Sequence, residues 1–234
     1  DDIWSRHPDV VFLAEAFTSP AMMHELARLG FSQSYTYFTW RTSAWELRSY
    51  VEELRDGSDA PWFRPNFWPS TPDILSGPLR GGSRQQFEIR LVLAALLAPS
   101  YGVYSGYELC ENTPQGPDNE EYFDSEKYRI VTRDWAGSSG SLMPLFGRLN
   151  EIRRGHPAVK SLRNLRFVHV DDPNVLAWTL AGLSGAAPLL VVVNLSDQAV
   201  VETMVRFDPV AVGVDPAGYI AIDLLTNESW EWSG

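Results

Sequence analysis

Cysteine, basic residues and long apolar runs are scarce in this sequence. Cys110 is the single cysteine in 234 residues, which excludes an intrachain disulfide framework and fits a reducing compartment. There are 19 Lys and Arg against 30 Asp and Glu, and the net charge of −11 argues against binding phosphate backbones or anionic lipid. The first residues carry no signal peptide, and the apolar runs are too short to span a bilayer. We therefore expect a cytoplasmic protein that binds neither nucleic acid nor membrane.

Motifs for nucleotide cofactors and for metals are also absent. The sequence contains no GxGxxG or Walker loop and no pair of closely spaced cysteines. Its four histidines show no metal-ligand spacing; they are His7, His24, His156 and His169. We therefore expect no cofactor and no metal site. What is present is 44% hydrophobic residues, enough to build a sizeable core.

Two patterns follow one another along the chain and change near residues 155–157, where Gly, His and Pro stand together. Before this point, expected strands at 10–14, 34–38, 64–67 and 103–107 alternate with expected helices at 21–29, 42–55 and 84–98. This alternation predicts parallel βαβ units. Afterwards the period-two pattern predicts an antiparallel β-sandwich, with strands at 165–170, 175–181, 188–195, 200–206, 219–223 and 229–232. We predict domains 1–155 and 156–234, the second incomplete at its end.

The first region is too short for a complete (β/α)8 barrel, which needs about 250 residues. It offers about 150 residues and roughly four strands, which suffice for half of one. The predicted α/β fold is therefore the C-terminal half of a (β/α)8 TIM barrel followed by an antiparallel β-sandwich. The other half is expected upstream of Asp1, because residues 1–7 read like the tail of a helix.

Two acidic residues stand just beyond expected strands of the first region. Glu15 interrupts an apolar run, where a carboxylate has to be ion-paired or held in a pocket that raises its pKa. Asp73 lies in the loop after 64–67, where capping a turn is the simpler interpretation. Ligands bind at the carboxyl ends of parallel strands, and glycosidic chemistry requires paired carboxylates. Glu15 and Asp73 are therefore candidate catalytic residues, with ion pairing and turn capping as the alternatives.

An acidic segment at 120–130 provides a third candidate. Most acidic loops are only solvated surface, and this interpretation applies here as well. In the alternative interpretation, Lys127 donates hydrogen bonds to sugar hydroxyls while the adjacent Tyr128 ring packs on a pyranose. The nine Trp and nine Tyr of the sequence are consistent with a carbohydrate cleft, although about half of them are expected in the core.

Three strings of residues resemble the maltosyltransferases that use maltose 1-phosphate, within the α-amylase superfamily, glycoside hydrolase family thirteen. They are FLAEAFT at 12–18, NFWPSTPDIL at 66–75 and DSEKY at 124–128. Most α-amylase relatives carry His immediately before the third carboxylate, the position of Pro72 here. The maltosyltransferase branch shares that substitution, so the resemblance is to this branch.

The resemblance implies retaining transfer of a maltosyl unit from maltose 1-phosphate to the non-reducing end of an α-1,4-glucan or maltooligosaccharide, with release of phosphate, in glycogen or α-glucan biosynthesis. It implies that Glu15 is the general acid/base and that Asp73 stabilises the oxocarbenium-like transition state. Lys127 and Tyr128 are implied to bind the distal glucose of the donor. The nucleophile and most phosphate ligands are implied to lie upstream of Asp1, so the chain is expected to be inactive alone. The full-length protein is expected to be a homodimer.

Two alternatives stay open. An α-amylase-superfamily hydrolase or trehalose synthase shares the predicted fold but does not depend on a phosphorylated donor. A non-catalytic glucan-binding protein retains the cleft without the nucleophile. Phosphate dependence separates the first from maltosyl transfer, and binding without turnover identifies the second.

Overall fold

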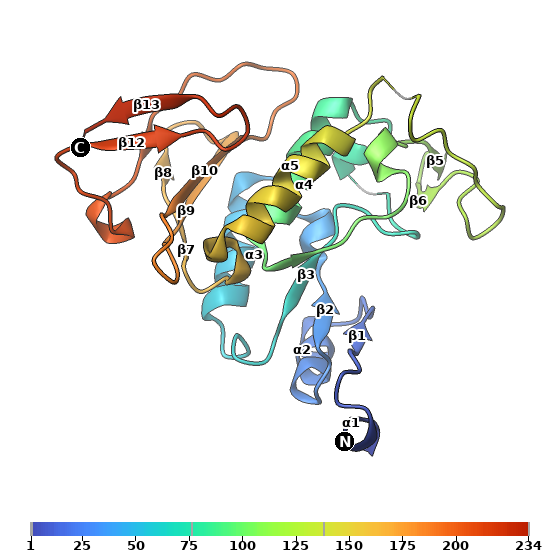
Figure 1. Ribbon diagram of the computed structural model, residues 1–234. Helices are drawn as coiled ribbons and strands as arrows, with labels where there is room; N and C mark the ends of the chain where they lie inside the picture. The colour runs from blue at the N-terminus through green and yellow to red at the C-terminus, as the bar shows by residue number, and fades with distance from the viewer. Residues whose placement is uncertain (1, 76, 138, 234) are drawn as a thin grey trace.

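Four short parallel strands and the helices between them form the first part of the molecule (Figure 1). The computed structural model describes residues 2–75, 77–137 and 139–233. The sheet has the strand order β1-β2-β3-β4, which follows the order of the chain. Its elements are α1 (Asp2–Arg6), β1 (Leu13–Ala14), α2 (Pro20–Arg28), β2 (Gln33–Tyr35), the 3-10 helix η1 (Tyr37–Trp40), α3 (Ala44–Asp56), β3 (Pro65–Phe67), the 3-10 helix η2 (Gly77–Leu79), α4 (Arg84–Leu97) and β4 (Ser100–Tyr101).

Serine residues begin the three longer helices of this part. The hydroxyls of Ser19, Ser43 and Ser83 each accept a backbone N–H from the first turn of α2, α3 or α4. In α3, the Glu46 carboxylate accepts the Ser43 backbone N–H in return, at 3.0 Å, which completes a capping box. Local sequence therefore fixes where these helices start.

The two faces of the parallel sheet differ in chemistry. Because the strand order is sequential and such crossovers are right-handed, the intervening helices fall on one face. On that face the buried ring of Phe67 stacks on Phe38, with centroids 4.4 Å apart. On the opposite face Gln33 Nε2 donates to Ser100 Oγ at 2.9 Å, and Ser100 Oγ donates to Asn66 Oδ1 at 3.1 Å. This second face carries a polar layer that no helix of the parallel units covers.

Antiparallel strands form the second part, after helix α5 (Met143–Gly155) and the 3-10 helix η4 (Pro157–Lys160). The largest sheet of this second part has three strands in the order β10-β9-β7. The strands are β7 (Leu165–Phe167), β8 (His169–Val170), β9 (Val175–Leu180), β10 (Leu189–Asn194), β11 (Val205–Arg206), β12 (Tyr219–Ile222) and β13 (Ser229–Trp232), with the 3-10 helix η5 (Val210–Val212) before β12. β8 pairs with β11, and β12 pairs with β13. The antiparallel pairing expected here is confirmed, whereas its assembly into a sandwich stays a prediction.

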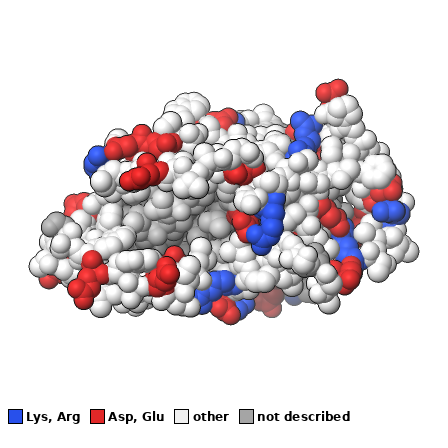
Figure 2. All heavy atoms as spheres, turned by 90° about the horizontal axis from the view of Figure 1, so that it is seen from above, with Lys and Arg blue, Asp and Glu red and all other residues white. Residues whose placement is uncertain are grey.

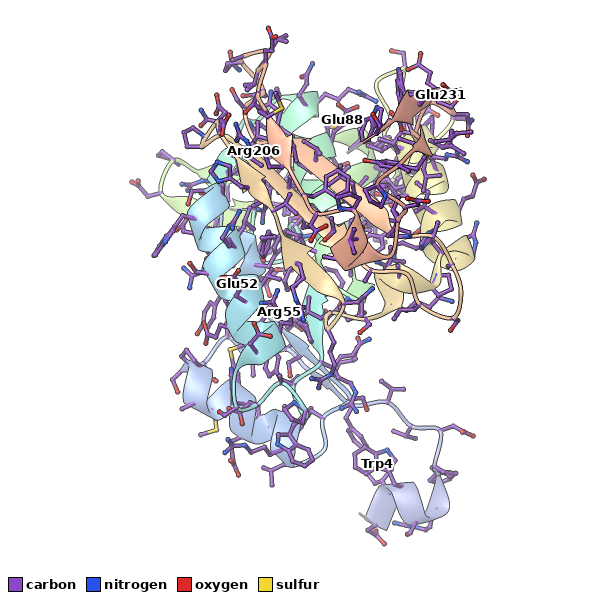
Figure 3. All side chains as sticks on the ribbon, turned by 90° about the vertical axis from the view of Figure 1, so that its left-hand side faces the viewer. Trp4, Glu52, Arg55, Glu88, Arg206 and Glu231 are labelled. Carbon is purple, nitrogen blue, oxygen red and sulfur yellow. The ribbon has the colours of Figure 1, made fainter. Side chains whose placement is uncertain are left out.

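One hydrophobic core runs through both parts. Trp178 of β9 is fully buried, and its Nε1 donates to the Leu96 carbonyl of α4 at 3.3 Å. From α3, Arg55, labelled in Figure 3, donates to the Leu165 carbonyl of β7 at 2.8 Å. The predicted domain boundary coincides with the end of α5 at Gly155, but the division into two domains stays a prediction.

The prediction of a strand at 103–107 is wrong. The strand is β4 at Ser100–Tyr101, which pairs with β3. The chain then turns at Gly106, with φ +98°, into the 3-10 helix η3 (Tyr107–Leu109). Tyr107 is fully buried with its ring 4.9 Å from that of Phe87. A buried aromatic turn therefore produces the same apolar run as a strand.

Other expectations also change. The expected strand 10–14 shortens to β1, and the expected strand 165–170 divides into β7 and β8, which belong to different sheets. The expected strand 34–38 ends as β2 at Tyr35, and η1 follows it. The expected strand 200–206 is reduced to β11, and Val200 is fully exposed. Helix α5 was not among the predicted elements, although its buried residues, Phe146 and Leu149, follow buried Leu142 at helical spacing.

Acidic side chains are spread over the molecular face in Figure 2, with fewer basic ones between them. Within residues 2–75, 77–137 and 139–233, no helix is both long and apolar enough to cross a bilayer. The same residues contain no group of three or more His, Cys, Asp or Glu placed to hold a metal ion. Cys110 is a half-buried free thiol, and burial raises its pKa.

Candidate active site

The predicted site residues gather at the carboxyl edge of the parallel sheet. Glu15 directly follows β1, and Asp73 lies in the loop after β3. Parallel strands end at the same edge, so both acids leave the sheet there. Lys127 and Tyr128 come from the loop that follows the hairpin of β5 (Pro114–Gly116) and β6 (Asn119–Tyr122), and Lys127 reaches Asp73. This is the edge at which parallel α/β proteins bind ligands.

Glu15 is exposed at this edge. The register Ala14–Ser34 places it beside Tyr35, the last residue of β2. The pKa of Tyr35 is raised to about 12, mainly by burial and also by the negative charge of Glu15. In the part of the chain that the structure describes, the Glu15 carboxylate forms no ion pair. Within the described residues the expectation of a paired or pocketed Glu15 is therefore not met, because β1 has a neighbouring strand on one side only and the side chain of Glu15 is exposed.

Asp73 lies in a tight turn. Thr71 and Ile74 close this turn with two backbone hydrogen bonds of 3.0 and 3.2 Å, and Thr71 Oγ1 accepts the Asp73 N–H at 3.3 Å. The side chain of Asp73 is used elsewhere, since its Oδ1 lies 2.7 Å from Lys127 Nζ. The acid for which turn capping was the simpler interpretation therefore contacts the third motif.

Lys127 and Tyr128 share Glu121 of β6. Lys127 Nζ donates to Glu121 Oε1 at 2.9 Å, and the Tyr128 hydroxyl donates to Glu121 Oε2 at 2.7 Å. The bond from Tyr128, and then that from Lys127, lowers the pKa of Glu121. The hydrogen bond to Asp73 is the main cause that raises the pKa of Lys127. Asp73, Glu121, Lys127 and Tyr128 thus form one charged cluster that is open to solvent.

The β5–β6 hairpin holds this cluster against the strand ends. The Leu75 N–H donates to the Glu120 carbonyl. The buried Tyr122 hydroxyl donates to Ser70 Oγ at 2.7 Å, and Trp40 Nε1 donates to the Glu120 carboxylate at 3.1 Å. The sequence indicated only an acidic loop here. The short hairpin is what brings that loop to the edge of the sheet.

Aromatic rings lie at the same edge. The centroids of Tyr35 and Trp68 are 4.9 Å apart, and those of Phe17 and Trp40 are 5.3 Å apart. Trp68 lies directly on Gly102, where an added Cβ would stand 2.3 Å from the ring, so the close approach requires glycine. Such rings form the apolar surface on which sugar rings pack. Phe17 and Trp68 belong to the motifs at 12–18 and 66–75, but no sequence pattern indicates that Phe17 meets Trp40 or that Trp68 meets Tyr35.

Comparison with known proteins finds relatives that are named as maltosyltransferases. A family described as GLGE, C-terminal, matches residues 167–234. The α-1,4-glucan:maltose-1-phosphate maltosyltransferase 2 of Streptomyces coelicolor is 49% identical over 235 residues, which cover 99% of this chain and 35% of that protein. The corresponding proteins of Methylacidiphilum infernorum and Mycolicibacterium smegmatis are 45% and 44% identical and are covered over 35% and 33% of their lengths.

Solved structures agree on the fold. An α-amylase from Geobacillus thermoleovorans, complexed with acarbose, superposes with a TM-score of 0.72 at 13% identity, covering 99% of this chain and 51% of that one. A maltogenic α-amylase from Thermotoga neapolitana gives a TM-score of 0.60 at 14% identity, with 98% and 51% coverage. These likenesses show an α/β fold of the α-amylase type. The chain belongs to the family of α-1,4-glucan:maltose-1-phosphate maltosyltransferases, and it spans about a third of the length of the curated relatives it matches.

Proposed function

We propose that this chain is part of an enzyme that transfers a maltosyl unit from maltose 1-phosphate to the non-reducing end of an α-1,4-glucan, releasing phosphate. The observation that carries the proposal is the 2.7 Å contact between Lys127 Nζ and Asp73 Oδ1. It joins two of the three motifs, and the third motif contains Glu15, which leaves the same edge of the sheet. Relatives named as maltosyltransferases, with 44% to 49% identity along nearly the whole chain, support it.

Each side chain of the edge receives a role in this proposal. Glu15 is the general acid/base: it protonates the departing phosphate oxygen and later accepts the proton of the acceptor 4-hydroxyl. Its exposure beside Tyr35 leaves room for both groups. Asp73 stabilises the positive charge of the oxocarbenium-like transition state. Lys127 and Tyr128 donate hydrogen bonds to the distal glucose, in exchange for their present contacts with Glu121.

The nucleophile belongs to the part of the enzyme outside these 234 residues in this proposal. A retaining reaction needs a second carboxylate about 5 to 5.5 Å from the acid/base. Most donor-phosphate ligands are assigned to the same outside part. The polar face of the sheet, with Gln33, Asn66 and Ser100, then faces the interior of a barrel that the remaining strands complete. Residues 1–234 alone are therefore proposed to be inactive.

Phosphate release tests the proposal. The full-length enzyme is incubated with maltose 1-phosphate and a maltooligosaccharide, and both phosphate and acceptor length are measured. We expect one phosphate per transfer and acceptors that grow by two glucose units. Release of free maltose without longer acceptors indicates a hydrolase. Turnover of unphosphorylated maltose, supplied in a parallel incubation, indicates a trehalose synthase, and binding without turnover indicates a glucan-binding protein. Each of these three results contradicts maltosyl transfer.

A further inference from the structure

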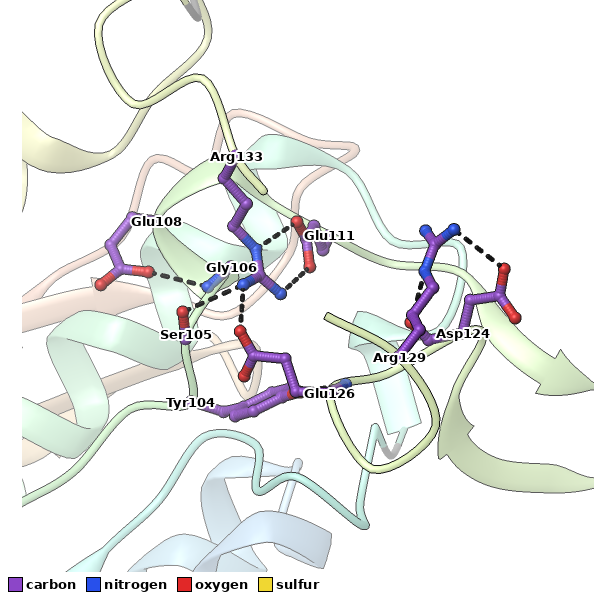
Figure 4. Close-up of polar contacts among 9 residues, drawn as sticks. All are labelled: Tyr104, Ser105, Gly106, Glu108, Glu111, Asp124, Glu126, Arg129 and Arg133. Carbon is purple, nitrogen blue, oxygen red and sulfur yellow. Dashed lines mark hydrogen bonds and ion pairs between the residues drawn. The ribbon is translucent and has the colours of Figure 1, made fainter. Parts of the chain in front are cut away.

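A buried arginine lies at the base of the loop that carries Lys127 and Tyr128 (Figure 4). The side chain of Arg133 is only 5% exposed. Its Nε and Nη2 donate to the two carboxylate oxygens of Glu111 at 2.7 and 2.9 Å. Its Nη1 donates to Glu126 Oε1 at 2.6 Å and to Ser105 Oγ at 3.1 Å. One guanidinium therefore joins three segments of the chain.

The backbone beneath this contact is shaped to accept it. Gly106 has φ +98°, and a Cβ added there would stand 2.2 Å from Glu111 Oε2 and 2.8 Å from Arg133 Nε. The Gly106 N–H donates to Glu108 Oε2 at 3.2 Å. The planar ion pair thus lies on bare backbone, an arrangement that suits the two-pronged geometry of arginine and that lysine cannot reproduce.

Glu126 connects this ion pair to the sugar-binding pair, because it directly precedes Lys127. Its side chain accepts from Arg133, and its backbone N–H donates to the Tyr104 hydroxyl at 3.3 Å. Tyr104 is only 7% exposed, and its ring lies 5.1 Å from that of Tyr122 in β6. The residue before Lys127 is therefore fixed through both its side chain and its main chain.

We propose that Arg133 is a positioning residue for Lys127 and Tyr128, an inference that rests on the sugar-binding role proposed for those two. Between β6 and α5 the described residues form no helix or strand. Backbone hydrogen bonds from Phe123 to Thr113 and from Leu142 to Glu108 anchor the ends of this loop, and the side chains of Glu126, Lys127 and Tyr128 add the contacts described above. Arg133 holds Glu126 and thereby sets Lys127 within reach of Asp73. Without it, the donor has to order the loop on binding, which weakens binding rather than the chemical step.

Kinetics of the Arg133→Met variant of the full-length enzyme test this role. We expect the KM for maltose 1-phosphate to rise about 10-fold or more, while kcat changes by less than about 3-fold. Arg133→Lys keeps the charge but not the two-pronged contact and should give an intermediate KM. The matched control is Arg129→Met: Arg129 lies in the same loop, but it forms a 3.3 Å ion pair with Asp124 in which both side chains are about half exposed, at 58% and 45%. The Arg129→Met variant should have the wild-type KM for maltose 1-phosphate.

A double variant shows whether Arg133 acts through Lys127. Lys127→Ala is measured alone and together with Arg133→Met. If Arg133 works by positioning Lys127, the double variant has nearly the KM of Lys127→Ala. The Lys127 side chain is then already absent, so the loss of Arg133 has no further effect on donor binding. If the fold-increase in KM of the double variant equals the product of the fold-increases of the two single variants, the two residues act independently and the inference is overturned.

Hydrogen exchange in the unliganded enzyme separates this inference from the proposed function. Amides of peptides covering 124–130 should exchange faster in Arg133→Met and not in Arg129→Met. If Lys127→Ala leaves KM unchanged, the sugar-binding role fails, and faster exchange still supports Arg133 as the residue that fixes the loop. A lower melting temperature with unchanged exchange and unchanged KM assigns Arg133 a purely structural role and overturns the inference.

Discussion

Glu15 is the residue with the sharpest kinetic prediction. Glu15→Gln keeps the shape of the side chain but replaces the ionisable carboxyl group with an amide that cannot act as a general acid/base. We expect kcat/KM for maltosyl transfer to fall by about 10²- to 10⁴-fold, the usual contribution of a general acid/base. The melting temperature of residues 1–234 should not change, because the Glu15 side chain is exposed and unpaired among the described residues. Glu231→Gln, an exposed acid of β13 labelled in Figure 3, is the control and should retain full activity. Near-normal transfer by Glu15→Gln removes it from the acid/base role.

His156 makes stability depend on pH. It follows α5, its Nδ1 is buried without a hydrogen-bond partner in the described part of the chain, and burial lowers its pKa below the ordinary 6.5. The unfolded chain therefore binds this proton more readily than the folded one. The free energy of unfolding should fall as pH drops below about 6.5 and should not depend on this group at higher pH.

Urea unfolding at pH 7.5 and 5.5 measures the contribution of His156. The wild-type protein should lose more stability between these values than the His156→Asn variant, in which nothing titrates at this position. An equal loss in both proteins contradicts the prediction.

At the scale of elements, the contribution of the α3 capping box to the free energy of unfolding can be tested. Ser43→Ala removes the hydroxyl that accepts the Glu46 N–H, so about 1 kcal/mol of unfolding free energy should be lost. Ser58→Ala, an exposed serine just beyond the same helix, is the control and should change stability by less than about 0.5 kcal/mol. Chemical denaturation of the two variants compares them directly, and equal losses show that the cap does not matter.

Elements with local signals were predictable and those without were not. Helix α3 begins one residue after Ser43, close to the expected 42–55, because cap and apolar period are both written in the sequence. The prediction of a strand at 103–107 was wrong because Tyr104 and Tyr107 are buried in a turn against the helices. Aromatic residues in such a turn give the same apolar pattern as a strand. Most strand lengths were overestimated, since pairing partners decide where a strand ends; β11 has only two residues, whereas β13 has the expected length.

At the scale of the molecule, the core that joins both parts predicts shared stability. Trp178→Ala empties a fully buried site between β9 and α4, and about 3–5 kcal/mol should be lost. Hydrogen exchange of peptides from α4 and β9 should then accelerate together. Trp230 lies on β13 and is 45% exposed, so Trp230→Ala should change neither the free energy of unfolding nor the exchange of these peptides. Faster exchange in β9 alone means that the region after residue 155 opens independently.

The sequence by itself determined the change from α/β alternation to antiparallel strands, and it singled out Glu15, Asp73, Lys127 and Tyr128. It was able to do so because periodicity, helix caps and motif strings are local properties of a chain. Only the tertiary structure decided that Lys127 touches Asp73, since that contact depends on the β5–β6 hairpin packing on the strand ends. It also decided the place of Arg133, whose partners come from separate segments. Contacts between distant segments arise from packing, and no local pattern encodes them.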